Sequence, residues 1–212
     1  MYKRQPFLKF NAGVFSLSKY KIVSSSFKKF TECDGGQCLS AKGMLHTRIQ
    51  LPSGVEVDVF NTHLQAFKTA VEIRKTQVEE ILSHMKKVND GRRAVILVGD
   101  FNISAKREEY TSLIARLAQE GFRDSWVELN GADQGYTWDS YINNWGAEGI
   151  DSDGKSQHRF DYIFVKNGTM QEIELESSKI IFDQPLGLSE KSEKYFLSDH
   201  FGVELNLKIK NK

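Results

Sequence analysis

The sequence predicts an α/β sandwich, in which two β-sheets pack face to face and helices lie outside them. Three observations lead to this prediction. Short apolar runs bounded by turn residues recur along the chain and are typical of buried strands. Two amphipathic helical patterns are interspersed among those runs. The length of 212 residues suits one domain with a sizeable core, so we expect a single domain over residues 1–212.

The expected strands are stretches that alternate between apolar and polar residues or are apolar throughout. Residues 13–23 partly alternate, whereas residues 24–41 are polar and contain glycine, which favours a loop or an irregular edge. Leu51-Pro52-Ser53-Gly54 separates two of the strands and indicates a hairpin. The complete set of expected strands is 13–23, 44–50, 55–61, 93–98, 160–166, 171–182 and 201–208.

Two segments carry apolar residues at helical spacing. The first begins at Thr69-Ala70-Val71-Glu72, a pattern that fits a capping box, and ends near Asn89. The second covers residues 106–120. The stretch from Asp124 to His158 is rich in glycine and asparagine, so we expect no regular structure there.

The composition of the chain limits the classes of binding partner that we expect. Lysine and arginine number 29 against 28 aspartates and glutamates, a net charge of +1, which gives no electrostatic reason for tight nonspecific binding of nucleic acid or anionic membrane. No run of about 18 apolar residues could form a transmembrane helix. Residues 1–10 lack the apolar core of a signal peptide, and a soluble protein that is either secreted or cytoplasmic fits the chain.

The two cysteines, Cys33 and Cys38, are separated by Asp-Gly-Gly-Gln. A small disulfide fits an exported protein, and two thiols fit a reducing compartment, so both alternatives stay open. Two cysteines without a Cys-x-x-Cys motif are too few for a zinc site.

Four short polar clusters adjoin the ends of apolar runs. An isolated buried charge costs several kcal/mol unless it is paired or bound to a metal, and strand ends are where α/β scaffolds usually build sites. We therefore expect a functional site where the clusters meet. They are Asn61-Thr62-His63, Gly99-Asp100-Phe101-Asn102, Phe160-Asp161-Tyr162 and Ser198-Asp199-His200.

Each cluster has a chemical interpretation and a structural alternative. Asp100 and Asn102 point to the same side of an extended segment, where they could deprotonate a water and supply an oxygen ligand, or they could form an Asx turn that caps helix 106–120. Asp161 enters an apolar strand and needs a partner, for which His63 and His200 are the candidates.

The clusters together indicate metal-assisted phosphodiester hydrolysis. Carboxylate and amide oxygens are hard ligands suited to Mg²⁺, and two imidazoles can hold a phosphoryl group. No serine or cysteine nucleophile motif competes with this interpretation. The residues combined in it are His63, Asp100, Asn102, Asp161, Asp199 and His200.

In these four motifs, taken in chain order, the sequence resembles the endonuclease/exonuclease/phosphatase superfamily. The resemblance implies a four-layered α/β sandwich of the deoxyribonuclease-like type. It also implies that Asp100 holds or activates the attacking water, that Asn102 and His63 contact the phosphate, and that Asp161 orients His63 or the nucleophile. Asp199 and His200 would complete the site, with Asp100, Asn102 and Asp199 as ligands of Mg²⁺ or another divalent cation.

Within the superfamily the chain looks most like the neutral sphingomyelinases, on the stretches Phe15–Ile22, Lys42–His46, Val57–Ala66 and Tyr136–Asp139. This implies a phospholipid substrate such as sphingomyelin. An aromatic loop with Trp138, Tyr141 and Trp145 could then touch a membrane surface transiently, although such aromatics also pack locally.

One departure from the superfamily pattern concerns the N-terminal part of the domain. The family begins with a strand that carries a metal-binding Asn and a strand that ends in a metal-binding Glu, and neither Asn11 nor Glu32 matches them. We therefore expect an N-terminally truncated domain that lacks the first strands of the family fold. Two alternatives follow: a nuclease on the same scaffold, which the near-neutral charge makes less favoured, and a non-catalytic remnant.

Overall fold

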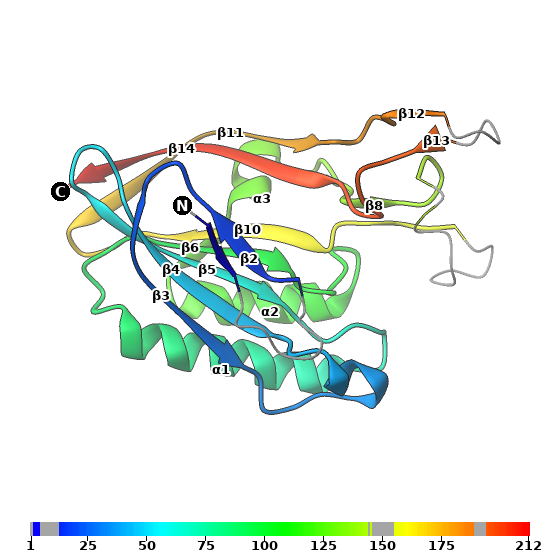
Figure 1. Ribbon diagram of the computed structural model, residues 1–212, viewed down its shortest axis with the longest axis horizontal. Helices are drawn as coiled ribbons and strands as arrows, with labels where there is room; N and C mark the ends of the chain where they lie inside the picture. Colours follow the sequence, from blue (N-terminus) through cyan, green and yellow to red (C-terminus); the bar gives the residue numbers. More distant parts are fainter. Residues whose placement is uncertain (1, 5–12, 144, 146–154, 189–193) are drawn as a thin grey trace.

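A mixed sheet of six strands forms the centre of the protein (Figure 1). The computed structural model describes residues 2–4, 13–143, 145, 155–188 and 194–212. Strands β5 and β6 are parallel and are joined by helix α1, whereas every other neighbouring pair in this sheet is antiparallel. The strand order is β3 (Lys21–Lys29), β4 (Gly43–Gln50), β5 (Glu56–His63), β6 (Val95–Asp100), β10 (Asp161–Lys166) and β7 (Phe122–Asp124).

Helices α1 (Val71–Val88) and α2 (Glu108–Gln119) cover one face of this sheet (Figure 1). Val78, Ile81, Leu82 and Met85 recur at the spacing of one helix face, and all four are buried. Each side chain that is fully buried in such a core stabilises the fold by about 1.5–3 kcal/mol. The sheet contributes Met44, Phe60, Leu97, Phe101 and Phe164 to the same core.

A two-stranded antiparallel sheet of β11 (Gln171–Ile181) and β14 (Gly202–Asn211) packs on the other face. Val57, Ala94, Val165 and Ile173 form the buried cluster between the two sheets. The predicted α/β sandwich is therefore confirmed, and the described residues form three of its expected four layers: helices, central sheet and second sheet. Helix α3 (Ser125–Asn130) contacts both β10 and β11.

Short elements complete the described chain. They are the pairs β1 (Tyr2–Arg4) with β2 (Phe15–Leu17), β8 (Trp138–Asp139) with β9 (Gln157–His158) and β12 (Gly187–Leu188) with β13 (Lys194–Tyr195), and a 3₁₀ turn η1 (Gly35–Leu39). Cys33, which precedes η1, and Cys38 within η1 form a disulfide. None of the helices in the described part of the chain is long and apolar enough to span a membrane.

Residues 24–41 contain both of the expected alternatives. Residues 24–29 belong to β3, the edge strand of the central sheet, whose pairing register with β4 shifts between Ile22 and Ser24, and the residues after them include η1. Two local predictions are wrong. The strand expected over 13–23 is split into β2 and the start of β3. Residues 124–158 contain α3, whose first amides at Trp126 and Val127 donate to the Asp124 carboxylate.

The expected capping box is also absent. Helix α1 begins at Val71, and Ala70 occupies its N-cap position without a side-chain hydrogen bond. Tertiary contacts stabilise the first turn instead. The buried Arg74 side chain donates hydrogen bonds to the carbonyls of Gln65 and Phe67, which precede the helix.

Candidate active site

Strand register brings three of the predicted residues into one row across the central sheet. Asp100 ends β6, and its Cα partners are His63 on the parallel strand β5 and Asp161 on the antiparallel strand β10. Side chains of directly paired residues project from the same face of a sheet, so the three lie side by side. The row exists because all three strands place their polar residue at the same edge.

Asp161 pairs with His200, which resolves the choice that the sequence left open. His200 lies just before β14, and its Nδ1 donates a hydrogen bond to Asp161 Oδ2 at 2.7 Å. Trp138 packs edge-on against the imidazole, with ring centroids 5.0 Å apart. Burial by itself would lower the pKa of His200, but the hydrogen bond and charge of Asp161, with Asp100 and Asp199, outweigh it and raise the pKa to about 9.

Asp100 has a different environment from an ordinary surface carboxylate. Burial raises its pKa, and the facing charge of Asp161 raises it further, while His63 and His200 oppose both effects. His63 Nε2 lies 3.3 Å from Asp100 Oδ2. The row is therefore a pair of carboxylates with one imidazole at each end.

Asn102 is held tightly beside Asp100. Its backbone adopts a left-handed φ of 53°, its amide N donates to Asp100 Oδ1 at 2.7 Å, and its side-chain Nδ2 donates to the Leu64 carbonyl at 3.1 Å. The Asx turn considered from the sequence thus forms. It does not cap the following helix, because α2 begins at Glu108 with Arg107 at its N-cap.

Gly99 is required where β6 reaches the site. Its φ is 137°, and a Cβ at this position would lie 2.0 Å from the Thr62 carbonyl oxygen of β5. A larger residue would push apart the two strands that carry His63 and Asp100.

The donor set fits a divalent cation. Ligand atoms of Asp100, Asp161 and His200 all lie within 4.8 Å of one another. Two facing carboxylates repel each other, and a hard cation relieves that repulsion while accepting oxygen donors. Asn102 adjoins this group, whereas Asp199 is exposed at the rim, where its Oδ1 accepts a hydrogen bond from Ser198 Oγ.

A cavity of about 550 Å³ opens over the row. Its lining includes five of the predicted residues, namely His63, Asp100, Asn102, Asp199 and His200. Asp161 lies directly behind His200 through their hydrogen bond. Of the predicted aromatic loop, Trp138 lines the cavity, while Tyr141 and Trp145 are 53% and 62% exposed.

Lys42 and Arg107 also line the cavity, and the sequence analysis did not select them. Lys42 is buried, and its Nζ donates to the Leu64 carbonyl at 2.6 Å. Burial lowers its pKa to about 8, although the charge of Asp100 opposes the shift. A lysine between Ala41 and Gly43 carries no signal of this role in a single sequence, because only the fold places it beside Asn102.

His158, which the sequence left undetermined, lies outside the cavity lining. Its Nδ1 is hydrogen-bonded with Ser104 Oγ at 2.7 Å, and its ring stacks on Phe160. His158 therefore supports the wall behind the site.

Comparison with known proteins agrees with this geometry. Residues 12–137, more than half of the chain, match the family described as Endonuclease/Exonuclease/phosphatase family 2. The chain belongs to this family. The matched segment includes the strands that carry His63 and Asp100.

Curated relatives extend the likeness. A sphingomyelinase of Mycobacterium tuberculosis is 30% identical over 121 residues, which cover 57% of this chain and 24% of the relative. An inositol phosphosphingolipids phospholipase C of Schizosaccharomyces pombe is 28% identical over 235 residues, which cover 94% of this chain and 52% of the relative. The matched regions thus span about a quarter to a half of these relatives.

Solved structures share the fold. Beta toxin from Staphylococcus aureus superposes with a TM-score of 0.74 at 23% identity, over 92% of this chain and 68% of the toxin. Danio rerio TDP2 in complex with a single-stranded DNA product gives a TM-score of 0.69 at 21% identity, over 89% and 68%. At these identities the likeness concerns the fold alone.

Proposed function

We propose that this chain is the catalytic part of a Mg²⁺-dependent phosphodiesterase that hydrolyses a phospholipid such as sphingomyelin. The observation that carries the proposal is the row of His63, Asp100, Asp161 and His200, of which His63, Asp100 and His200 line the cavity and Asp161 holds His200. Family membership and the sphingomyelinase relatives support the same reaction class.

In the proposed reaction a water oxygen attacks phosphorus and the ester P–O bond breaks. Asp100 takes the proton of the attacking water, and its raised pKa makes it a stronger base than an exposed carboxylate. His200, protonated at neutral pH and held by Asp161, gives a proton to the departing ester oxygen. Asn102 and His63 contact the phosphoryl oxygens.

Asp100, Asn102 and Asp199 are the proposed Mg²⁺ ligands, and the grouping of Asp100, Asp161 and His200 offers a competing set. A bound divalent cation would lower the pKa of water and stabilise the negative charge of the phosphoryl group. Replacing Asp199 or Asp161 by Asn distinguishes the two sets, because only a ligand's loss raises the Mg²⁺ concentration needed for half-maximal activity.

Exposed apolar side chains near the site support a lipid surface as the partner. Leu188 and Leu197 are 64% and 57% exposed near the β12–β13 pair, and Tyr141 and Trp145 follow β8. These elements lie at the end of the molecule where β10 and β14 begin, next to Asp161 and His200 (Figure 1). Exposed apolar side chains on elements at the same end of the molecule as a site favour contact with a membrane.

The test compares sphingomyelin vesicles with plasmid DNA, each with Mg²⁺ and with EDTA, for the wild type and Asp100→Ala. Mg²⁺-dependent release of phosphocholine by the wild type alone supports the proposal. Cleavage of DNA without lipid turnover would favour the nuclease alternative, which the fold shared with TDP2 makes the second candidate. A folded sample that turns over neither substrate would favour the non-catalytic remnant.

A further inference from the structure

A short loop at the cavity is closed by the disulfide between Cys33 and Cys38. Gln37 lies in this loop, within η1, and lines the same cavity as the proposed catalytic residues. Its backbone carbonyl accepts hydrogen bonds from the amide N of Ser40 at 3.0 Å and from the Oγ of Ser40 at 2.8 Å. The loop therefore holds Gln37 at the cavity wall, and the proposed reaction gives this residue no role.

The side-chain amide of Gln37 has one end occupied. Its Oε1 accepts a hydrogen bond from the backbone N of Ala66 at 3.1 Å. A backbone N–H can only donate, so the atom that it contacts is the oxygen, and the amino group Nε2 is the other end of the amide. This Nε2 has no hydrogen-bond partner among the residues that the structure describes. Gln37 therefore offers a donor that a ligand in the cavity can use.

Two hydrogen bonds join the disulfide loop to the segment that follows His63. One is the bond from Ala66 to Gln37, and in the other the buried Gln65 donates from its Nε2 to the Asp34 carbonyl at 3.3 Å. The disulfide restricts the conformations of the loop that carries these two acceptors. The position of Gln37 at the cavity therefore depends on the closed loop.

The segment that follows His63 is also bonded to two other residues of the cavity lining. The Leu64 carbonyl accepts hydrogen bonds from Asn102 Nδ2 at 3.1 Å and from Lys42 Nζ at 2.6 Å. Asn102 is a proposed contact of the phosphoryl oxygens. One stretch of backbone thus positions several hydrogen-bond donors along the cavity, and Gln37 belongs to this group.

We propose that Gln37 is a further substrate-binding residue, whose Nε2 donates a hydrogen bond to a phosphoryl oxygen of the phosphodiester. This inference rests on the proposed phosphodiesterase function. A hydrogen bond to an anionic oxygen is stronger than one between two neutral groups, and a neutral amide can donate it without the cost of burying a second charge. The disulfide loop holds the donor in place before the substrate arrives, which reduces the entropy lost on binding.

Gln37→Glu separates a direct contact from a supporting role. The carboxylate still accepts the hydrogen bond from the Ala66 amide, but a negatively charged oxygen replaces the donor Nε2. For the soluble substrate p-nitrophenylphosphocholine, kcat/KM should fall about thirtyfold or more, because charge repulsion replaces a hydrogen bond to an anion. Gln37→Ala should lower it about tenfold. If Gln37 only supported Ala66, the alanine variant would be the more damaged of the two.

Gln134→Glu is the matched control for the added negative charge. Gln134 is exposed and lies outside the cavity lining, and its Nε2 donates to the Ala132 carbonyl at 3.2 Å. This variant should keep kcat/KM within about twofold of the wild type, because solvent and salt screen an exposed charge. Hydrogen exchange at the Ala66 amide checks the local structure: protection should persist in Gln37→Glu and decrease in Gln37→Ala.

Reduction of the disulfide tests whether the loop positions Gln37. Dithiothreitol supplies two electrons and two protons, so the Cys33–Cys38 bond becomes two thiols while the reductant becomes a cyclic disulfide. The chain has only these two cysteines, so the effect is confined to this loop. Reduction should lower kcat/KM of the wild type about threefold and should change that of Gln37→Ala little, because the contact that the loop positions is already absent.

The outcomes separate this inference from the function on which it rests. No turnover by folded, oxidised wild type would overturn the proposed function and the Gln37 contact with it. Turnover that Gln37→Glu lowers less than Gln37→Ala, or as little as Gln134→Glu, would overturn the contact alone. A loss seen with sphingomyelin in mixed micelles but not with p-nitrophenylphosphocholine would move the donor to the lipid amide or hydroxyl and overturn the phosphoryl contact. Equal effects of reduction on the wild type and Gln37→Ala would refute the positioning by the loop.

Discussion

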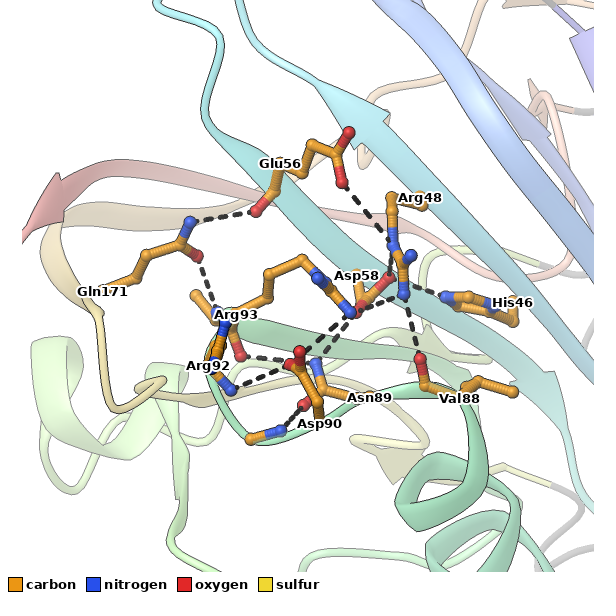
Figure 2. Close-up of polar contacts among 12 residues, drawn as sticks. His46, Arg48, Glu56, Asp58, Val88, Asn89, Asp90, Arg92, Arg93 and Gln171 are labelled. Carbon is orange, nitrogen blue, oxygen red and sulfur yellow. Dashed lines mark hydrogen bonds and ion pairs between the residues drawn. The ribbon is translucent and has the colours of Figure 1, made fainter.

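Asp58 and Asp100 lie at opposite ends of the parallel pair β5 and β6, and their neighbours differ in kind. Asp58 is fully buried and accepts hydrogen bonds from His46 (2.8 Å), Arg48 (2.8 Å), Arg93 (3.0 Å) and Asn89 (2.8 Å), as Figure 2 shows. Asp100 faces a second carboxylate and two imidazoles.

The difference appears in the two pKa values. Burial opposes ionisation of Asp58, but the hydrogen bonds from His46, Arg48 and Arg93 outweigh it and hold the pKa of Asp58 well below its usual range. Burial and Asp161 raise the pKa of Asp100. A buried carboxylate surrounded by donors stabilises the fold, whereas one left facing another acid is available to a proton or a cation.

The largest expected effect is a loss of activity without a loss of stability when Asp100 is replaced. Asp100→Ala should lower phosphodiesterase kcat by about 10³-fold or more, because it removes the proposed general base, which is also a proposed metal ligand. The free energy of unfolding should change by less than about 1 kcal/mol, since the substitution also relieves repulsion with Asp161. Steady-state kinetics and urea unfolding measure the two effects; a large loss of stability with retained kcat would reverse the roles given to the two aspartates.

Replacement of Asp58, at the other end of the strands, should destabilise the fold without lowering the activity of the folded molecules. Asp58→Asn leaves two arginines without their carboxylate and should cost about 3–5 kcal/mol of unfolding free energy. Activity per folded molecule should persist, because the cluster lies at the other end of the strands. The matched control is Glu56→Gln, whose partly exposed carboxylate lies 4.0 Å from Arg48 and whose loss should cost at most about 0.5 kcal/mol. Equal costs for both variants would contradict the argument.

The pH dependence of the unfolding free energy tests the stabilising role of Asp58 further. Because the pKa of Asp58 is lower in the folded protein than its usual value of 3.8, its stabilisation is complete above that value. The stabilisation is lost as the pH falls through the folded-state pKa. Urea unfolding between pH 2 and 7 should therefore show a difference between wild type and Asp58→Asn that is constant above about pH 5 and shrinks in acid. A difference that grows in acid would refute the assigned direction.

The smallest expected effect tests the redundancy of the donors. Arg93→Gln removes one of four donor side chains around Asp58 and should cost only about 1–1.5 kcal/mol, because His46, Arg48 and Asn89 remain. Chemical denaturation measures this cost directly. A loss as large as that of Asp58→Asn would show that Arg93 dominates the cluster instead of sharing it.

Periodicity predicted the elements whose pattern is local. Helix α1 and strands β4, β6 and β10 appear close to their expected bounds, because each shows its apolar face within a few residues of sequence. The sequence left open whether the residues after 23 form a loop or an irregular edge, because an edge strand can be polar and its identity depends on pairing with β4. Helix α3 was missed because six residues are too few for a period.

The sequence by itself determined which chemical groups are present at the candidate site. Carboxylate, amide and imidazole groups at the ends of apolar strands are local features, and they identified His63, Asp100, Asn102, Asp161 and His200 before any contact was known. Their type is the basis of the proposed hard-metal and proton-transfer chemistry on a phosphodiester.

Only the tertiary structure decided which groups meet. It paired Asp161 with His200, left Asp199 at the rim, and brought Lys42 and Arg107 into the cavity lining. These contacts join residues far apart in the sequence, such as Asp161 and His200 at a separation of 39 positions, so they depend on strand register and on the buried Arg74, which bonds both the Phe67 carbonyl and Glu109. The local sequence encodes which groups are present, and long-range packing sets the distances between them. Because of those distances, Asp58 is surrounded by hydrogen-bond donors, whereas Asp100 faces another carboxylate.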